Sequence, residues 1–176
     1  MIKIALIYGA IAGAIVIGIM TFGIASSENG SAQSSQAFGY LIMLVALSLI
    51  FIGVKQYRDR DQGGVIKFGP AFLLGLSIAS VSGLVYVAGW ETYLAFSDYA
   101  FISEYAAGVI EAKREAGASA AELEKIAAEM EKMVKNYGNP LFRLPLTFME
   151  IFPVGLIIAL ISAALLRNPK VLPARG

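Results

Sequence analysis

The residue best placed to do chemistry is Glu150, a carboxylate inside the last apolar stretch of the chain. An ionisable group at membrane depth typically relays protons, binds an ion or pairs with another charge. Arg143 lies two turns earlier on roughly the same helical face and is a candidate partner. The sixteen apolar or small residues of 151–166 nearly suffice for a tilted crossing, so Glu150 also fits a hydrated position near the interface. Both interpretations stay open.

A second candidate site is a basic cluster between the second and third apolar runs: Lys55, Tyr57, Arg58, Arg60 and Lys67. Basic residues beside a membrane attract anionic lipid headgroups, and this cluster also suits a nucleotide or a partner protein. The same residues are expected without any ligand, because short cytoplasmic loops are rich in Lys and Arg. Asp59 and Asp61 alternate with the arginines and can neutralise them.

Small residues recur every four positions in three apolar runs, which lets helix backbones approach closely. The candidate packing positions are Gly9, Gly13, Gly75, Ala79, Gly83, Gly155 and Ala159. We expect them to pack the spans within one chain. Dimerisation through one stripe is the alternative.

Other kinds of site have no support in the sequence. Cysteine and histidine are absent, which excludes thiolate nucleophiles, Ser-His-Asp arrangements and the usual structural zinc. No phosphate loop, nucleophile elbow or metal-ligand spacing occurs. A net charge of +1 gives no basic signature for nucleic acid. We expect no catalytic residue, no cofactor, no metal and no enzymatic activity.

The composition predicts an all-α, polytopic membrane protein. The chain is 57% hydrophobic and only 15% charged, against roughly 25% charged in soluble domains. Transmembrane helices are predicted over 4–25, 37–54 and 68–89 within residues 1–90, and over 141–166. A polar loop at 26–36 joins the first two. Residues 91–140 form a polar insert, and 167–176 form a tail that we expect to be disordered.

The insert carries nine of the thirteen acidic residues. A first helix is expected after a cap at Ser97–Asp98, and a second after Ser119, which forms a capping-box pattern with Glu122. Each helix has one apolar face. The favoured interpretation is an antiparallel hairpin that buries these faces against each other. The alternatives are a helix on the bilayer surface and an exposed groove for a partner.

Basic residues near the span ends predict the orientation. They concentrate at the amino terminus, in the 55–67 loop and in the tail, whereas acids outnumber bases in the insert. Both termini are therefore expected in the cytoplasm and residues 91–140 outside it.

Two segments resemble the bacterial "domain of unknown function 4199" family: Ile52-Gly53-Val54-Lys55-Gln56-Tyr57-Arg58-Asp59 and Gly64-Val65-Ile66-Lys67-Phe68-Gly69-Pro70-Ala71-Phe72. The resemblance implies four spans, a polar helical insert before the last span and a bacterial inner membrane. It supplies no activity. We expect a non-enzymatic scaffold or modulator of a membrane partner, in contact with the lipid bilayer and with a protein partner or further copies of itself. The alternative is a small oligomeric transporter or channel that uses Glu150 and the polar residues of the third span.

Overall fold

The computed structural model describes residues 1–25 and 36–174. These residues form helices and no strand: α1 (Ile2–Ala25), α2 (Gln36–Leu47), α3 (Leu49–Asp61), α4 (Phe68–Phe96), α5 (Phe101–Glu115), α6 (Ala120–Tyr137) and α7 (Pro140–Leu166). The predicted loop at 26–36 lies outside the described residues, except for Gln36, which begins α2.

Four helical segments are long and apolar enough to cross a membrane: Ile2–Ile24, Gly39–Asp61, Phe68–Phe96 and Pro140–Leu166. The second of these combines α2 and α3, which meet at a one-residue break at Ser48. The predicted all-α class with four membrane-length helices is confirmed. The chain therefore has the character of a multi-pass membrane protein.

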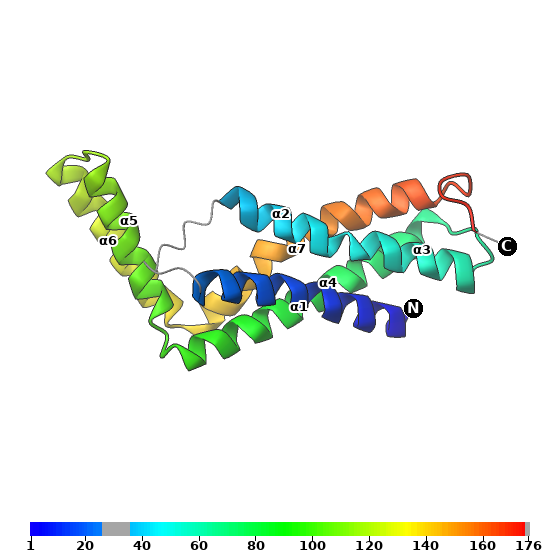
Figure 1. Cartoon of the computed structure of the whole chain (residues 1–176), viewed down its shortest axis with the longest axis horizontal. Coiled ribbons are helices and arrows are strands. Elements are labelled where there is room, and N and C mark those ends of the chain that lie inside the picture. Colours follow the sequence, from blue (N-terminus) through cyan, green and yellow to red (C-terminus); the bar gives the residue numbers. More distant parts are fainter. Residues whose placement is uncertain (26–35, 175–176) are drawn as a thin grey trace.

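Helix α4 is the centre of the bundle. It runs parallel to α1, so that Gly9 packs on Val81 and Gly13 on Val85, and it runs antiparallel to α7 (Figure 1). The core between these helices and α3 consists of aliphatic side chains such as Ile50, Leu74, Ile78 and Ile151. Many large apolar side chains on the outer faces are exposed, as expected for surfaces that contact lipid.

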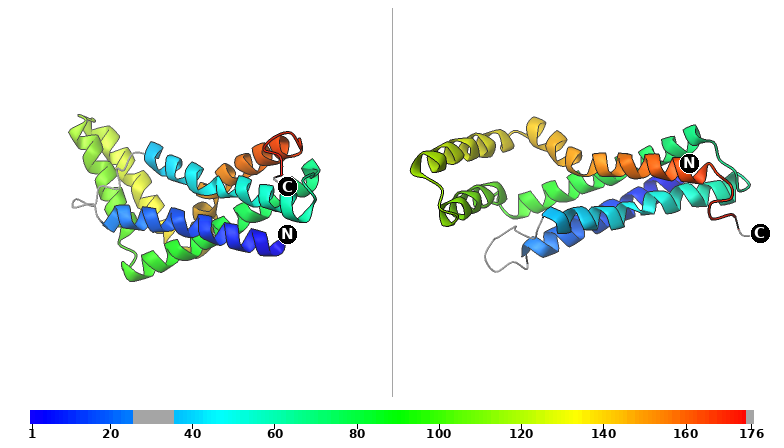
Figure 2. Two further views of the ribbon diagram at one scale, coloured as in Figure 1. Left: turned by 45° about the vertical axis from the view of Figure 1, so that its right-hand side comes forward. Right: turned by 90° about the horizontal axis from the view of Figure 1, so that it is seen from above.

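Helices α5 and α6 form an antiparallel hairpin at the end of the bundle opposite both termini (Figures 1 and 2). The capping box expected at the start of α6 is confirmed, since the Ser119 side chain accepts from the Glu122 backbone and Glu122 reaches back to the Ser119 backbone. The cap expected at Ser97–Asp98 is wrong. Helix α4 continues to Phe96, and α5 begins at Phe101 without a side-chain cap.

The expectation of a disordered tail is also wrong for residues 168–174. Val171 and Leu172 accept hydrogen bonds through their backbone carbonyls from Arg58, which is completely buried. A turn around Asn168 starts this return, because its side chain accepts from the backbone of Lys170 and its carbonyl from the backbone of Val171. The tail therefore packs against the end of α3.

Candidate functional site

Small residues set the spacing between α4 and α7. Gly75 faces Ala159 and Ala79 faces Gly155, with a Cβ added to either glycine lying 2.8–2.9 Å from the opposing alanine. The helices are antiparallel, so moving four residues along α4 toward the hairpin corresponds to a residue number lower by four on α7. Three such steps beyond Ala79 and Gly155 bring Glu91 opposite Arg143. The close seam thus determines which polar side chains meet where the bundle joins the hairpin.

Glu91 and Arg143 form a two-point ion pair at this position. Arg143 donates from Nε to Glu91 Oε1 over 2.6 Å and from Nη2 to Oε2 over 2.7 Å. The side chain of Arg143 is only 3% exposed, and that of Glu91 is 26% exposed. A guanidinium matches a carboxylate in this fork geometry, which fixes direction as well as distance.

Arg143 also holds the end of the hairpin. Its Nη1 donates to the backbone carbonyl of Tyr137 over 2.8 Å, at the last residue of α6. Its Cζ lies 5.1 Å from the centre of the Tyr99 ring and 5.7 Å from that of Tyr137, within the range of cation–π contacts. One side chain on α7 thereby contacts α4, the α4–α5 turn and the end of α6.

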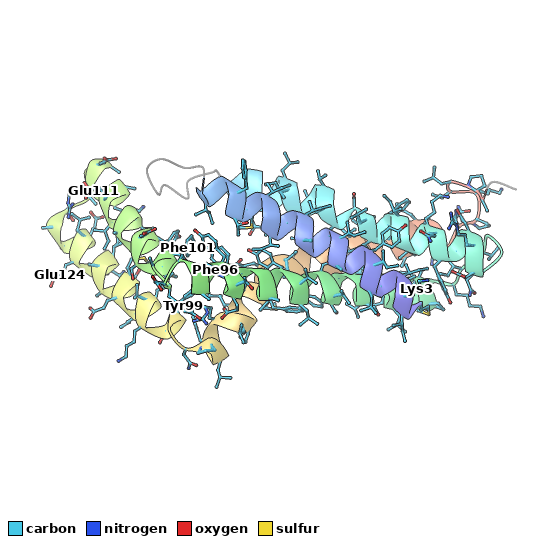
Figure 3. The ribbon with its side chains drawn as sticks, turned by 60° about the horizontal axis from the view of Figure 1, so that its bottom comes forward. Lys3, Phe96, Tyr99, Phe101, Glu111 and Glu124 are labelled. Carbon is cyan, nitrogen blue, oxygen red and sulfur yellow. The ribbon has the colours of Figure 1, made fainter. Side chains whose placement is uncertain are left out.

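The α4–α5 turn has an unusual backbone. Asp98 and Tyr99 have φ angles of 49° and 58°, in the left-handed region that side chains larger than glycine rarely adopt. Figure 3 shows Tyr99 at the base of the hairpin, close to Phe96 and Phe101. This conformation costs free energy, and it accompanies the contact between the Tyr99 ring and Arg143.

Trp90 completes the arrangement. Its indole Nε1–H donates to the hydroxyl of Tyr137 over 2.7 Å, and its ring contacts Tyr93 and Phe101. Burial raises the pKa of Tyr137, while the bond from Trp90 acts in the opposite direction. We call the five residues Trp90, Glu91, Tyr99, Tyr137 and Arg143 the hairpin junction.

An open recess of about 330 Å³ lies beside the hairpin junction. Its walls come from the α4–α5 turn, the start of α5, the end of α6 and the start of α7: Tyr99, Ile102, Ser103, Val134, Tyr137, Gly138, Pro140 and Arg143. The charge of Arg143 is already matched by Glu91. The recess has therefore the chemistry of a contact surface, with aromatic and aliphatic walls.

Glu150 does not pair with Arg143. Its carboxylate instead accepts a hydrogen bond of 3.0 Å from the hydroxyl of Tyr86 on α4, and that hydroxyl lies 3.3 Å from the sulfur of Met20 on α1. The residue as a whole is exposed on the surface of α7. Glu150 lines neither the pocket at the tip of the hairpin nor the recess at its base.

The polar residues of the third span bond within their own helix. Ser77, Ser80 and Ser82 each donate to the carbonyl four residues earlier, at 2.8–2.9 Å. These bonds satisfy the hydroxyls without a ligand.

The basic cluster is divided in the structure. Arg58 is a correction to the predicted lipid-facing set, because it is 0% exposed and binds Asp59 and the tail. Lys55 pairs with Asp59, and the hydroxyl of Tyr57 accepts from Gln62. Arg60 and Lys67 are exposed.

All seven predicted packing positions lie between helices of one chain. Gly9 and Gly13 face α4, Gly83 receives the Phe148 ring of α7, and the remaining four form the α4–α7 seam. These stripes are therefore occupied inside the bundle.

Sequence reasoning missed most of the hairpin junction. Of its five members, the sequence indicated only Arg143 as a candidate site residue. The four-residue spacing of the small residues gave a partial signal, because it marks the faces of α4 and α7 that can approach closely. The sequence did not indicate that Tyr99 and Tyr137, at the two ends of the hairpin, both contact Arg143.

The hairpin junction holds α4, α6 and α7 together through the ion pair and hydrogen bonds of Arg143. Within residues 1–25 and 36–174, no group of three or more His, Cys, Asp or Glu side chains is placed to hold a metal ion. Glu111 and Glu124 are exposed near the tip of the hairpin (Figure 3), and Glu111 forms an ion pair there with Arg114.

A comparison with protein families identifies the family of this chain and names no activity. A family model described as "Protein of unknown function (DUF4199)" matches residues 3–168. No curated protein and no solved structure matches the chain. Because the family model covers nearly the whole sequence, the chain belongs to the DUF4199 family.

Proposed function

We propose that the chain is a non-enzymatic accessory protein of the bacterial inner membrane that scaffolds or modulates a membrane partner through its hairpin, residues 91–140. In this proposal both termini lie in the cytoplasm and the hairpin lies outside it. The observation that carries the proposal is a contrast within the hairpin. Its base is tied to the spans by buried polar contacts, while its apolar faces are only partly covered.

The burial of apolar side chains differs along the hairpin. Ile102, Ala106 and Tyr137 at the base are buried. Farther along, the residues that face the other helix are half-buried: Val109, Ile110, Leu123, Ile126 and Met130. Tyr105 and Met133 are 41% and 36% exposed. Two helices alone cannot cover both apolar faces, so a partner that packs on them would gain hydrophobic burial.

The hairpin junction supports a role in passing movement of the hairpin on to the membrane-length helices. A partner that moves α5 or α6 would displace Tyr99 or Tyr137, and both contact Arg143. Arg143 is bonded to Glu91 on α4, the central helix of the bundle. The contacts thus connect the hairpin to the spans through fixed side chains rather than through a flexible linker.

The transporter alternative has less support. It needs a polar path that reaches Glu150, but the Glu150 carboxylate is bonded to Tyr86 and the span serines are bonded to their own helix.

Co-purification tests the proposed partner. The full chain and a Tyr105→Glu/Met133→Glu variant would be isolated in mild detergent beside a Glu115→Gln/Glu124→Gln variant, which changes exposed polar residues of the same hairpin. We expect one stoichiometric membrane protein with the wild type and the control, and its loss with the charged pair. If all three preparations contain only this chain, the proposal is wrong.

Cysteine labelling tests the proposed orientation. The chain has no cysteine, so single cysteines at the exposed positions Ser119 and Gln62 can be labelled in intact cells with an impermeant reagent. We expect label at position 119 and none at 62 until the cells are opened. Label at both positions from the same side would overturn the orientation.

A further inference from the structure

The end of the bundle that carries both termini has more positive charge at its surface than its protein contacts use. Five exposed basic residues lie at this end: Lys3 on α1, Arg60 on α3, Lys67 before α4, and Arg167 and Lys170 after α7. Figures 1 and 3 show these segments, with Lys3 labelled, at the end opposite the hairpin. We call these five residues the basic end.

Two neighbouring basic residues behave differently, which makes the comparison informative. Asp59 binds both Lys55 and Arg58 on α3, so its carboxylate offsets the positive charge of these two residues. None of the ion pairs found among the described residues involves a member of the basic end. Asp61 is the one further acidic side chain in the described part of this end, and it is exposed. The basic end therefore keeps an excess of unpaired positive charge.

Buried Arg58 controls where two of these charges lie. Its guanidinium donates to the carbonyls of Val171 and Leu172 and to Asp59, so it joins α3 to the returning tail. Ala174 lies against Gly64 in the α3–α4 turn, which extends the contact. Arg167 and Lys170, on the segment that leads into this contact, are therefore held beside the α3–α4 turn instead of moving freely in solution.

The depth of the basic end indicates its ligand. Each of the five residues lies within a few positions of the end of a membrane-length helix. Side chains at that depth are next to the phosphate groups of lipids, and long Lys and Arg chains extend readily to them.

We propose that the basic end binds the headgroup phosphates of anionic phospholipids, and that Arg58 is a positioning residue that keeps Arg167 and Lys170 in this surface. The proposal is independent of the partner proposed for the hairpin. A general attraction of positive charge to the membrane depends only on how many charges are present. The proposed site also requires that Arg58 hold Arg167 and Lys170 in place.

The test measures binding of fluorescent phosphatidylglycerol to the full-length protein in mixed micelles, with phosphatidylcholine of the same chain length as the neutral reference. An Arg167→Gln/Lys170→Gln variant removes two charges, and we expect affinity for phosphatidylglycerol to fall by roughly 25-fold, about five-fold per charge. The matched control, Lys113→Gln/Lys125→Gln, changes the same net charge on the exposed hairpin and should bind as wild type does. Equal losses in both variants, or no loss in either, would overturn the lipid site.

Arg58→Lys tests the positioning role. Lysine keeps the charge but lacks the planar fork that reaches Asp59 and two carbonyls together. We expect the lipid affinity to fall toward that of Arg167→Gln/Lys170→Gln, together with faster proteolysis after Arg167. Wild-type affinity in Arg58→Lys would overturn the role of Arg58. If that variant does not fold, the exposed-charge variants still decide whether the basic end binds lipid.

A competition arm separates lipid from a soluble anion. Inorganic phosphate and chloride would be compared at equal ionic strength, because added salt alone weakens exposed electrostatic contacts. We expect equal, modest weakening with both. Selective displacement of phosphatidylglycerol by phosphate would identify a soluble phosphate ligand and overturn the lipid assignment.

Discussion

Arg143 and Glu91 meet at the hairpin end of the α4–α7 seam, three four-residue steps from the contact between Gly155 and Ala79. The packing of small residues inside the bundle and the polar contact at its end therefore belong to one helix–helix register. Any change that shifts the seam also shifts the ion pair that holds the hairpin.

The ion pair should contribute measurably to stability. Arg143→Gln leaves the Glu91 carboxylate without its partner at a mostly buried position, and we expect the free energy of unfolding to fall by about 3 kcal/mol. Glu91→Gln should cost at least as much, because it leaves the Arg143 guanidinium, which is only 3% exposed, without a counter-charge. Unfolding of both single variants and the double variant in detergent gives the coupling, which we expect at about 0.5–3 kcal/mol. Strict additivity would show that the two side chains do not interact.

The seam should tolerate no added methyl group. A Cβ at Gly155 would lie 2.8 Å from Cβ of Ala79, so Gly155→Ala must push α4 and α7 apart. We expect a loss of about 1–3 kcal/mol in the free energy of unfolding. Gly18→Ala is the matched control, because no atom lies within 4 Å of its added Cβ. Equal stability of the two variants would contradict the close seam.

Trp90 is the only tryptophan of the chain, so its fluorescence reports on the hairpin junction. The side chain is 5% exposed and bonds to Tyr137. Arg143→Gln removes the donor to the Tyr137 carbonyl, and we expect acrylamide to quench Trp90 more strongly. Tyr137→Phe keeps the hydrogen bond from Arg143 to the backbone carbonyl at position 137 and should give a smaller increase in quenching. Unchanged quenching in Arg143→Gln would mean that Arg143 does not hold the end of α6.

The start of α6 should depend on pH. The backbone N–H and hydroxyl of Ser119 donate to the Glu122 carboxylate, each over 2.8 Å, and hold the pKa of Glu122 below its usual range. A lowered folded-state pKa stabilises the cap above the ordinary glutamate pKa of about 4.3, and this stabilisation disappears as pH falls through the lowered value.

Hydrogen exchange checks this prediction. Protection factors for residues 119–124 should fall on acidification below about pH 4.3, whereas Glu122→Gln, whose amide oxygen can still accept from Ser119 but does not titrate, should show pH-independent protection there. Protection that stays constant in the wild type would contradict a functional capping box.

Features that depend on neighbouring residues could be predicted from the sequence, whereas contacts between residues far apart in the chain could not. The apolar run of α1 and the capping box at Ser119 depend on neighbouring residues, so both were predictable. The bond from Arg58 to Val171 joins residues 113 positions apart and requires the tail to fold back. The turn at Asp98 and Tyr99 was also missed, because Ser97–Asp98 resembles a helix cap while α4 in fact continues to Phe96. Periodicity shows which face of a helix is apolar but not which residue of another helix lies opposite.

Site-specific photo-crosslinking in living cells tests the central claim most directly. A photoreactive residue would replace Met133, on the partly covered apolar face of the hairpin, or Glu124 as an exposed polar control. Each would be placed in the wild-type, Arg143→Gln and Arg143→Lys backgrounds. We expect one discrete adduct with another membrane protein from position 133 alone, weakened in Arg143→Gln and less weakened in Arg143→Lys, which keeps a positive charge and hydrogen-bond donors at this position. Adducts that are absent, or identical from both positions in all three backgrounds, would contradict a partner-binding hairpin held by Arg143 and Glu91.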